Sequence, residues 1–582
     1  MTWFGFFALQ LSFIFMILGL GYWAASGLVS YLGLKKTFWI DRVCIGAFVI
    51  VFLFAILGIV VLLFPWAMRQ ILSGLVLASA FLLSTYVFFR KRLFKDVIES
   101  SRLEKIFLIG VVVMSGLGLA ISLLPVKLPN QLVDGPYVAK HDYLGVRVQY
   151  ITGNLPTDNS LPHVISEYLL RDISFKKERP VMPGQEVSNR PILVSLILVP
   201  IRAAFSLPSK LPDGLPKFNY VGIAWPDFSV LMQDDFGYLF SLSIGITLNA
   251  LIFLAVGAFA VRAQNKSTLI AAGVVALMLS SPYFIFQTIF TWPKELAAFF
   301  VLYSVLSYYK LKNPMLAGGF LAFGYLSHPY AIVFLIGFTF HAAYVYLKKW
   351  KWKWQGQNEN SLTSEFAVFD KIKYNGNHPI EIQPILSEKH FFQSIGIDNN
   401  VDVKFFISFL IVFAILVAPW FVWSKLILHI PSDLVSQNFI QSGQGSMDFF
   451  WIRTVNFFNT LLPVYLLHYP FDLNSLVLGS TVTMPGAIGI FVFAFSLMYF
   501  FENTFWKDKV FLIYIPSLLL IFIFSNQAVP ALHGLQGPIA LLLLVGAMQM
   551  RKILDTTWLS ILFSLQVIIN VLLLSRYFYK LL

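Results

Sequence analysis

The sequence predicts an all-α integral membrane protein, a polytopic bundle of about 12–14 transmembrane helices with a large structured external loop that contains short in-plane helices. Three observations predict this class. Of the 582 residues, 58% are hydrophobic and only 12% are charged, about half the charged fraction of a soluble protein. Apolar runs long enough to cross a bilayer recur along the chain. One polar, acid-rich stretch, residues 126–235, interrupts them.

Residues 1–125 are predicted to form an N-terminal membrane segment of four helices. Its apolar runs cover residues 1–34, 43–66, 70–89 and 106–124. The connection between the third and fourth runs contains Arg90, Lys91, Arg92, Lys95, Arg102 and Lys105. Because Lys and Arg hold loops in the cytoplasm, we expect this connection inside. The N-terminus and residues 126–235 are then external.

The middle of the chain, residues 236–347, is predicted to form helices five to nine. Residues 268–347 contain two pairs of spans that are short for a core of about 30 Å, so they are expected to be tilted or broken. Their outer turns fall near residues 292–295 and 328–329. Lysines then alternate with tryptophans at 348–354. Beside a span this pattern favours an interfacial anchor on the cytoplasmic side, followed by a cytoplasmic insertion at 348–403.

Residues 404–582 are predicted to form C-terminal membrane helices around a second external loop at about 429–483. One span is expected at 405–423. Four more are expected near residues 485–501, 510–525, 537–550 and 557–575. On this count Arg576 and Lys580 lie outside, a small departure from the charge rule.

Composition also narrows the function. The net charge of +13 is explained by the basic cytoplasmic turns, so nucleic acid is not expected as a partner. Cys44 is the single cysteine, which excludes an intrachain disulfide and a cysteine-based metal site. The sequence lacks a P-loop, a GxGxxG after a strand and an HExxH, the motifs of phosphate, dinucleotide and zinc-protease sites.

The loop 126–235 contains the candidate catalytic acids. Asp134 lies nine residues after Pro125, and Asp142 follows His141, so a carboxylate there can act as a general base near a lipid headgroup. Asp134 precedes Gly135 and Pro136, and from these residues alone a turn is the simpler explanation. Within the loop we expect a short helix at 161–170 and an in-plane helix at 191–207.

Basic residues near the same face are candidate substrate ligands. Arg147, Arg190 and Lys294 can hold a phosphate, since Arg binds phosphate in a bidentate manner. Lys294 belongs to the sequence WPKE, which is either an exposed turn or a cation facing a cavity. His328 lies in a second outer turn, where a structural role is the simpler interpretation. Arg453 either anchors an in-plane helix or binds an anionic headgroup.

These residues together resemble the GT-C superfamily of polytopic glycosyltransferases, which includes protein O-mannosyltransferases and bacterial aminoarabinose transferases. The resemblance rests on NRPILVSLILVP, FTWPKELAAFFVL, YLSHPYA and APWFVWSKL, and covers about residues 125–470. It also rests on an acidic residue soon after the span that opens the external loop. Two features depart from the family. Four spans precede the loop where the best-known members have one, and Gly135 stands where many members have a second acid, for which Asp142 is a substitute.

The resemblance implies a multi-pass enzyme of the cell (inner) membrane with a periplasmic active face. It implies transfer of a sugar from a polyprenyl-phosphate-linked donor, with inversion, to an acceptor hydroxyl. Asp134 takes the acceptor proton, and Arg147, Arg190 or Lys294 stabilises the leaving phosphate. The partners are this lipid-linked donor and membrane lipids. A divalent cation is compatible with the chemistry, although no residue pattern demands one.

Other functions fit the same sequence. A transporter or flippase is expected to carry ionisable residues inside its spans and a repeat between its halves. A polysaccharide polymerase or ligase of the cell envelope would rely on external Arg and His, for which Arg453 and His468 are available. A non-enzymatic assembly protein is the third alternative, and the length of the first external loop argues against it.

Overall fold

The structure is a computed structural model, and it describes most of the chain. The described residues are 3–34, 37–91, 93–125, 151, 157–181, 186–220, 223–227, 229–232, 234–263, 267–359, 403–430, 453–462 without 455 and 459, 488–501, 510–524 and 534–581. Among the predicted site residues, Asp134, Asp142 and Arg147 lie outside these ranges. Arg190, Lys294, His328 and Arg453 lie within them.

The N-terminal segment forms four long helical stretches. Helix α1 (Trp3–Met16) continues through a π turn into α2 (Tyr22–Tyr31). It is followed by α3 (Trp39–Leu63), α4 (Trp66–Arg90), the short α5 (Leu93–Glu99) and α6 (Arg102–Ser122). Ser101 and Glu104 form a capping box at the start of α6, which satisfies backbone N–H groups that the first turn leaves without partners. The four predicted spans are therefore confirmed as helices.

The segment between α6 and α11 folds into short elements. They are η4 (Thr157–Ser160), α8 (Leu161–Leu170), η5 (Val187–Asn189), α9 (Leu193–Phe205), and α10 (Ser229–Met232). An antiparallel hairpin of β1 (Lys217–Tyr220) and β2 (Ile223–Pro226) lies between α9 and α10. The short helix predicted at 161–170 is confirmed, and a helix occupies most of 191–207.

The central helices are α11 (Asp235–Ala250), α12 (Ile252–Ala260), α13 (Thr268–Ser280), α14 (Pro282–Ile289), α15 (Lys294–Leu306), α16 (Pro314–Ser327) and α17 (Ile332–Glu359). Helices α13 and α14 meet at a bend of 65°, because Pro282 has no N–H with which to continue α13. The predicted broken span is thus confirmed. The predicted insertion begins later than expected, because α17 continues as one helix through Glu359.

The C-terminal region contains α18 (Val403–Phe421), α23 (Ile490–Phe501), α24 (Val510–Phe524), α25 (Gln536–Ile553) and α26 (Thr556–Leu581). Each lies close to a predicted span. In the described part of the chain, eight helices are long and apolar enough to cross a membrane, or nine if α13 and α14 form one span. This is fewer than predicted, because several of the expected spans are short helices such as α16 and α23.

Interactions between segments that are distant in sequence show which helix ends lie together at each of the two ends of the molecule. At one end Arg262 binds Asp41 at 2.6 Å, and Tyr303 donates to Asp41. Nearby, the Tyr22 hydroxyl lies 3.1 Å from Asp96. We call this the basic end, because the turns rich in Lys and Arg lie there. At the opposite end, which we call the α8–α9 end, the residues after α6 pack on the first turns of α4 and α11.

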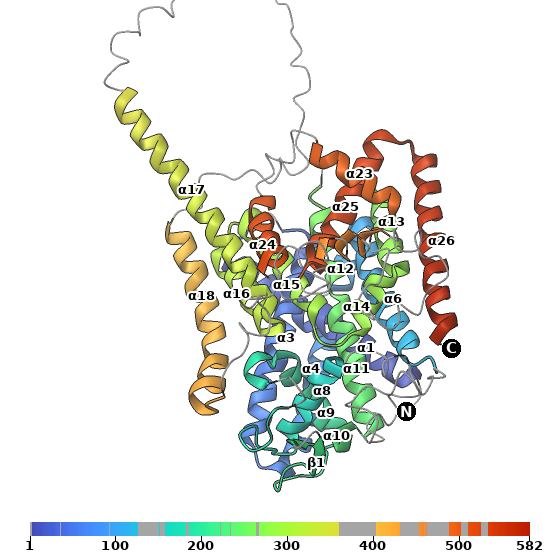
Figure 1. Ribbon diagram of the computed structural model, residues 1–582, viewed down its shortest axis with the longest axis vertical. Helices are drawn as coiled ribbons and strands as arrows, with labels where there is room; N and C mark the ends of the chain where they lie inside the picture. Colours follow the sequence, from blue (N-terminus) through green and yellow to red (C-terminus); the bar gives the residue numbers. More distant parts are fainter. Residues whose placement is uncertain are drawn as a thin grey trace, which may run out of the picture.

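Figure 1 shows these two ends far apart along the longest axis of the molecule. The last turns of α17 extend upward beyond the bundle, whereas α8, α9, α10 and β1 lie together at the bottom. Both chain termini lie on the lower right side. The arrangement places the lysine-rich part of α17 and the segment 157–234 at opposite ends of the protein.

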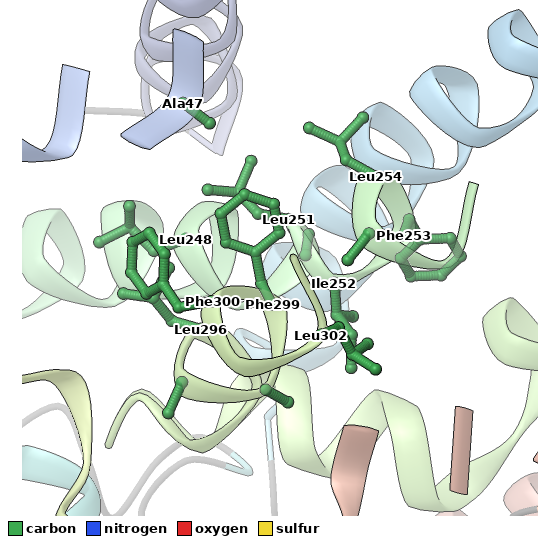
Figure 2. Packing of buried hydrophobic residues seen from close by; sticks show 14 of the residues in the cluster. Ala47, Leu248, Leu251, Ile252, Phe253, Leu254, Leu296, Phe299, Phe300 and Leu302 are labelled. Atoms are coloured by element: carbon green, nitrogen blue, oxygen red, sulfur yellow. The ribbon is translucent and has the colours of Figure 1, made fainter. Parts of the chain in front are cut away.

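The core lies where α11 and α12 pack against α15 and α3. Leu248 and Leu251 meet Phe299 and Phe300 there, with Ala47 of α3 on the far side (Figure 2). Each of these five side chains is at most 1% exposed. Inside a bilayer the alternative to such burial is contact with equally apolar lipid, so close van der Waals packing and polar contacts stabilise the bundle.

Candidate functional site

A cluster of cationic and aromatic side chains forms where the α14–α15 turn meets the start of α17. We call Arg190, Trp292, Lys294, His328 and Tyr330 the Trp292 cluster. The guanidinium carbon of Arg190 lies 4.6 Å from the centroid of the Trp292 ring, and the ammonium nitrogen of Lys294 lies 5.3 Å from it. The His328 ring lies 4.6 Å from the same centroid. Three segments that are distant in sequence therefore converge on one indole.

A hydrogen bond and tilted contacts between aromatic rings hold the cluster together. The Tyr330 hydroxyl donates to the backbone carbonyl of Lys294 at 2.8 Å, and the Tyr330 ring lies 5.0 Å from that of His328. The Nδ1 atom of His328 accepts from the Tyr330 N–H at 3.3 Å and so caps the turn before α17. This acceptor role leaves the ring proton of the neutral imidazole on Nε2.

Two asparagines shape the α14–α15 turn. The Asn249 side-chain amide donates to the carbonyls of Thr288 and Phe290 at 3.2 and 3.0 Å, and its oxygen accepts from Leu296 N–H at 3.2 Å. Asn159, just before α8, accepts from the Thr291 N–H, and its backbone carbonyl accepts from the Thr291 hydroxyl at 2.7 Å. These bonds replace the helical bonds that a broken span loses.

The turn is recessed in the protein and does not project into solvent. Thr291 packs on Gly245, about 15 Å along α11 from its first residue. A Cβ on Gly245 would lie 2.8 Å from Thr291 Cβ, so this close approach requires glycine. Lys294 is 4% exposed. The interpretation of WPKE as an exposed turn is therefore wrong, because α11 and η4 pack against this turn.

A buried carboxyl lies directly behind the cluster. Glu295 is completely buried, and its Oε2 accepts from the Thr288 hydroxyl at 2.6 Å. Within the described residues, no donor reaches its Oε1. A buried carboxylate without a paired cation is expensive at this depth, so Glu295 marks the break between α14 and α15 as a polar site inside the bundle.

A buried ion network fixes the segment that carries Arg190. Glu167 of α8 is paired with Arg171 at 2.7 Å and with Arg202 of α9 at 3.0 Å. Arg202 also binds Asp234, whose carboxylate accepts from Gly237 N–H at the start of α11. Glu167 and Arg202 are completely buried. The network joins α8, α9 and α11, and Asp234 acts as a helix cap.

Two further contacts secure the same segment. Arg69 of α4 donates to the Leu170 carbonyl at 3.2 Å and pairs with Asp172 at 2.8 Å. His163 of α8 is buried, with its Nε2 3.1 Å from the Leu231 carbonyl and its Nδ1 3.0 Å from Ser241 Oγ. Burial lowers the pKa of His163 below its ordinary value. A neutral histidine therefore links α8 to α10 and α11.

The structure brings together three of the predicted ligands: Arg190, Lys294 and His328. Arg453 is elsewhere at the same end of the molecule, where its guanidinium donates to the Phe522 carbonyl of α24 and its side chain is buried. That position matches a structural anchor. Asp134, Asp142 and Arg147 remain predictions, because they lie outside the described residues. Among the described residues, no group of three His, Cys, Asp or Glu side chains forms a metal site.

Sequence reasoning missed Trp292, Tyr330, Asn159 and Asn249 as parts of the site. The local sequence contained a weak signal for two of them, since Trp292 and Tyr330 flank the charged and histidine-containing turns. Nothing in the sequence pairs Asn159 with Thr291, which is 132 residues away. Comparison of the chain with models of known families, with curated proteins and with solved structures gave no match.

Proposed function

We propose that the protein is a membrane glycosyltransferase that moves a sugar from a polyprenyl-phosphate-linked donor to an acceptor on the external face. The Trp292 cluster is the observation that supports this proposal. Two cations, Arg190 and Lys294, lie against one indole at the α8–α9 end, within a membrane bundle. A phosphate attached to a lipid is an anion that such a pair can bind at that depth.

The chemistry follows from the charge that develops during transfer. As the sugar leaves, negative charge grows on the phosphate, and Arg190 and Lys294 would stabilise it. Asp134 would accept the proton of the acceptor hydroxyl, with Asp142 as the second acid. A single displacement at the anomeric carbon breaks the bond to the phosphate and inverts the centre.

The test is transfer of labelled sugar from polyprenyl-phosphate donors by the purified protein. Loss of one preorganised cation should lower turnover by about 100-fold, so Arg190→Ala and Lys294→Ala should both be strongly impaired. Asp134→Asn and Asp142→Asn test the acids. Lys210→Ala is the matched control, because Lys210 lies in the same segment but is 47% exposed. Turnover by both cation variants at the wild-type rate would refute the site.

A lipid transporter or flippase is the second candidate. The break between α13 and α14 favours this alternative, and so does the buried Glu295 at the next break, between α14 and α15, since discontinuous helices and intramembrane carboxyls line transport pathways. Reconstitution into vesicles separates the two functions. Movement of a fluorescent polyprenyl phosphate between leaflets without sugar transfer would support transport, whereas sugar transfer without movement would support the enzyme.

A further inference from the structure

A lateral groove opens between α1, α4, α9 and α11, away from the Trp292 cluster. Its volume is about 490 Å³. Small residues hollow it: Gly5 and Ala8 on α1, Gly74 and Ala78 on α4, and Ala204 on α9. Its lining has one polar side chain, Ser12, and the hydroxyl of this residue donates to the Ala8 carbonyl at 2.8 Å.

The groove lies within the part of the protein that faces lipid. Three of its four helices are parts of candidate membrane spans. Next to its lining residues, Phe4 of α1 and Leu75 of α4 are 71% and 62% exposed. These large apolar side chains form the surface that hydrocarbon chains cover in a bilayer. The groove is thus a deep site open to the membrane, with a size typical of small-ligand pockets.

We propose that this groove holds one acyl chain of a membrane phospholipid as a resident ligand. The lining carries no charged side chain, so the site recognises hydrocarbon and does not bind a phosphate. The nearest cation on α9, Arg202, is already paired with Glu167 and Asp234. The site therefore suits a lipid that is recognised through its acyl chain, while its headgroup stays in the membrane interface.

The groove lies at a different place from the Trp292 cluster, so its acyl chain is distinct from the lipid-linked donor of the proposed reaction. Arg190 precedes the first residue of α9, whereas the groove contacts its last turn through Ile201, Ala204 and Phe205. The two points are about 17 Å apart along the helix. A phosphate at the Trp292 cluster is therefore separated from the groove by most of the length of α9. The inference rests on the membrane-facing surface and not on glycosyltransferase activity.

The bound chain would support α9 from its open side. On the other side, α9 packs so tightly on α3 that a Cβ on Gly58 would lie 2.1 Å from the Leu196 carbonyl oxygen. The Phe205 ring lies 4.9 Å from that of Phe240 on α11, with the two rings tilted by 50°. An acyl chain between α1 and the last turn of α9 completes the packing of α9. Arg190 lies just before the first residue of this helix.

Gly74→Leu tests the proposal, because a side chain at Gly74 fills the groove. An ideal Cβ there has no heavy atom within 4 Å, and the same is true of Gly27 on α2, which lies outside the groove. Gly27→Leu is therefore the matched control, and Ala78→Phe is a second filling variant. The full-length proteins are purified in detergent with dioleoylphosphatidylglycerol, washed, and analysed by native mass spectrometry.

Wild type and Gly27→Leu should each retain one more phospholipid per chain than Gly74→Leu and Ala78→Phe. The wild-type melting temperature should fall when lipid is removed and recover with dioleoylphosphatidylglycerol, whereas the filled variants should not respond. Equal retention by wild type and both filled variants would overturn the proposal. So would displacement of the retained phospholipid by an equal amount of polyprenyl phosphate, which would make the occupant an isoprenoid.

Discussion

At the residue scale, Trp292 explains how two cations are held against one aromatic ring inside a membrane protein. Arg190 and Lys294 repel each other, and removing them from water is costly. The face of an indole attracts both charges. Lys294 also lies 4.8 Å from the Phe290 ring. The aromatic rings therefore stabilise two positive charges within the bundle.

Replacing Trp292 by leucine should weaken anion binding without removing either cation. Leucine keeps apolar volume but has no π face, so a loss of about 1–2 kcal/mol is expected, which is roughly 10-fold in affinity. The measurement is the dissociation constant for polyprenyl phosphate in detergent. Trp23→Leu, at an exposed tryptophan of α2, is the control. Equal affinity in both variants would argue against a role for the indole.

Acidification should destabilise the protein through His163. Burial lowers its pKa in the folded state, so the unfolded chain takes up a proton near pH 6.5 before the folded protein does. Stability is then complete above this range and is lost as the pH falls below about 6.5. His163→Gln should melt with a flatter pH dependence between pH 7 and 5, and His429→Gln, at an exposed position, should not. Parallel wild-type and His163→Gln curves would contradict this.

The sequence was enough to nominate individual ligand residues. It was only partly enough to predict that these residues come together in space. Arg190 was predicted as a ligand from the external loop, and Lys294 and His328 from two outer turns. The structure places all three around one ring. Their convergence depends on Asn159 and Asn249, which hold the α14–α15 turn through contacts across 132 and about 40 residues. A single sequence contains no signal for such long-range contacts.

At the element scale, a buried ion network joins α8 and α9 to the start of α11. Glu167 of α8 accepts from two arginines, the α8 cap residue Arg171 and Arg202 of α9. Arg202 in turn pairs with Asp234, the N-cap of α11. Buried ion pairs add little compared with apolar residues of the same shape, but removal of one partner leaves an uncompensated charge. The network therefore sets the position of α9 and with it that of Arg190.

Glu167→Gln tests this network. The change leaves Arg202 buried without its carboxylate partner on α8, and a loss of about 3–5 kcal/mol in stability is expected. Thermal unfolding in detergent, followed by tryptophan fluorescence, measures it. Glu99→Gln, at an exposed glutamate of α5, should melt like wild type. A Glu167→Gln protein that melts together with this control would show that the network is dispensable.

The elements themselves were largely predictable, because apolar runs of span length leave few alternatives to a helix. Tilted or broken spans were also predicted within residues 268–347, from the shortness of their apolar runs, and α13 and α14 form a bent pair there. The full length of α17 was not predicted, since lysines beyond Leu347 were interpreted as the start of an insertion. A helix continues past the membrane boundary when nothing stops it, and residues 348–359 contain neither proline nor a second glycine beside Gly356.

At the scale of the whole molecule, the protein has two chemically different ends. Interactions such as Arg262 with Asp41 and Tyr308 with His341 define the basic end without reference to the charge rule. Arg551 and Lys552 close α25, whose first residue, Gln536, bonds Gln287 of α14 toward the other end. The contacts therefore assign each of these turns to the same end of the molecule as the positive-inside rule does. The Trp292 cluster lies at the end away from most of the basic turns.

The central claim is that the Trp292 cluster faces the external side of the membrane, because the proposed enzyme uses its lipid-linked donor on that side. Single cysteines at Asp213 and Glu99, both exposed and at opposite ends, report it, since the native Cys44 is completely buried. A membrane-impermeant maleimide applied to intact cells should label Asp213→Cys, and Glu99→Cys only after permeabilisation. Labelling of Glu99→Cys in intact cells, with Asp213→Cys protected, would contradict the account.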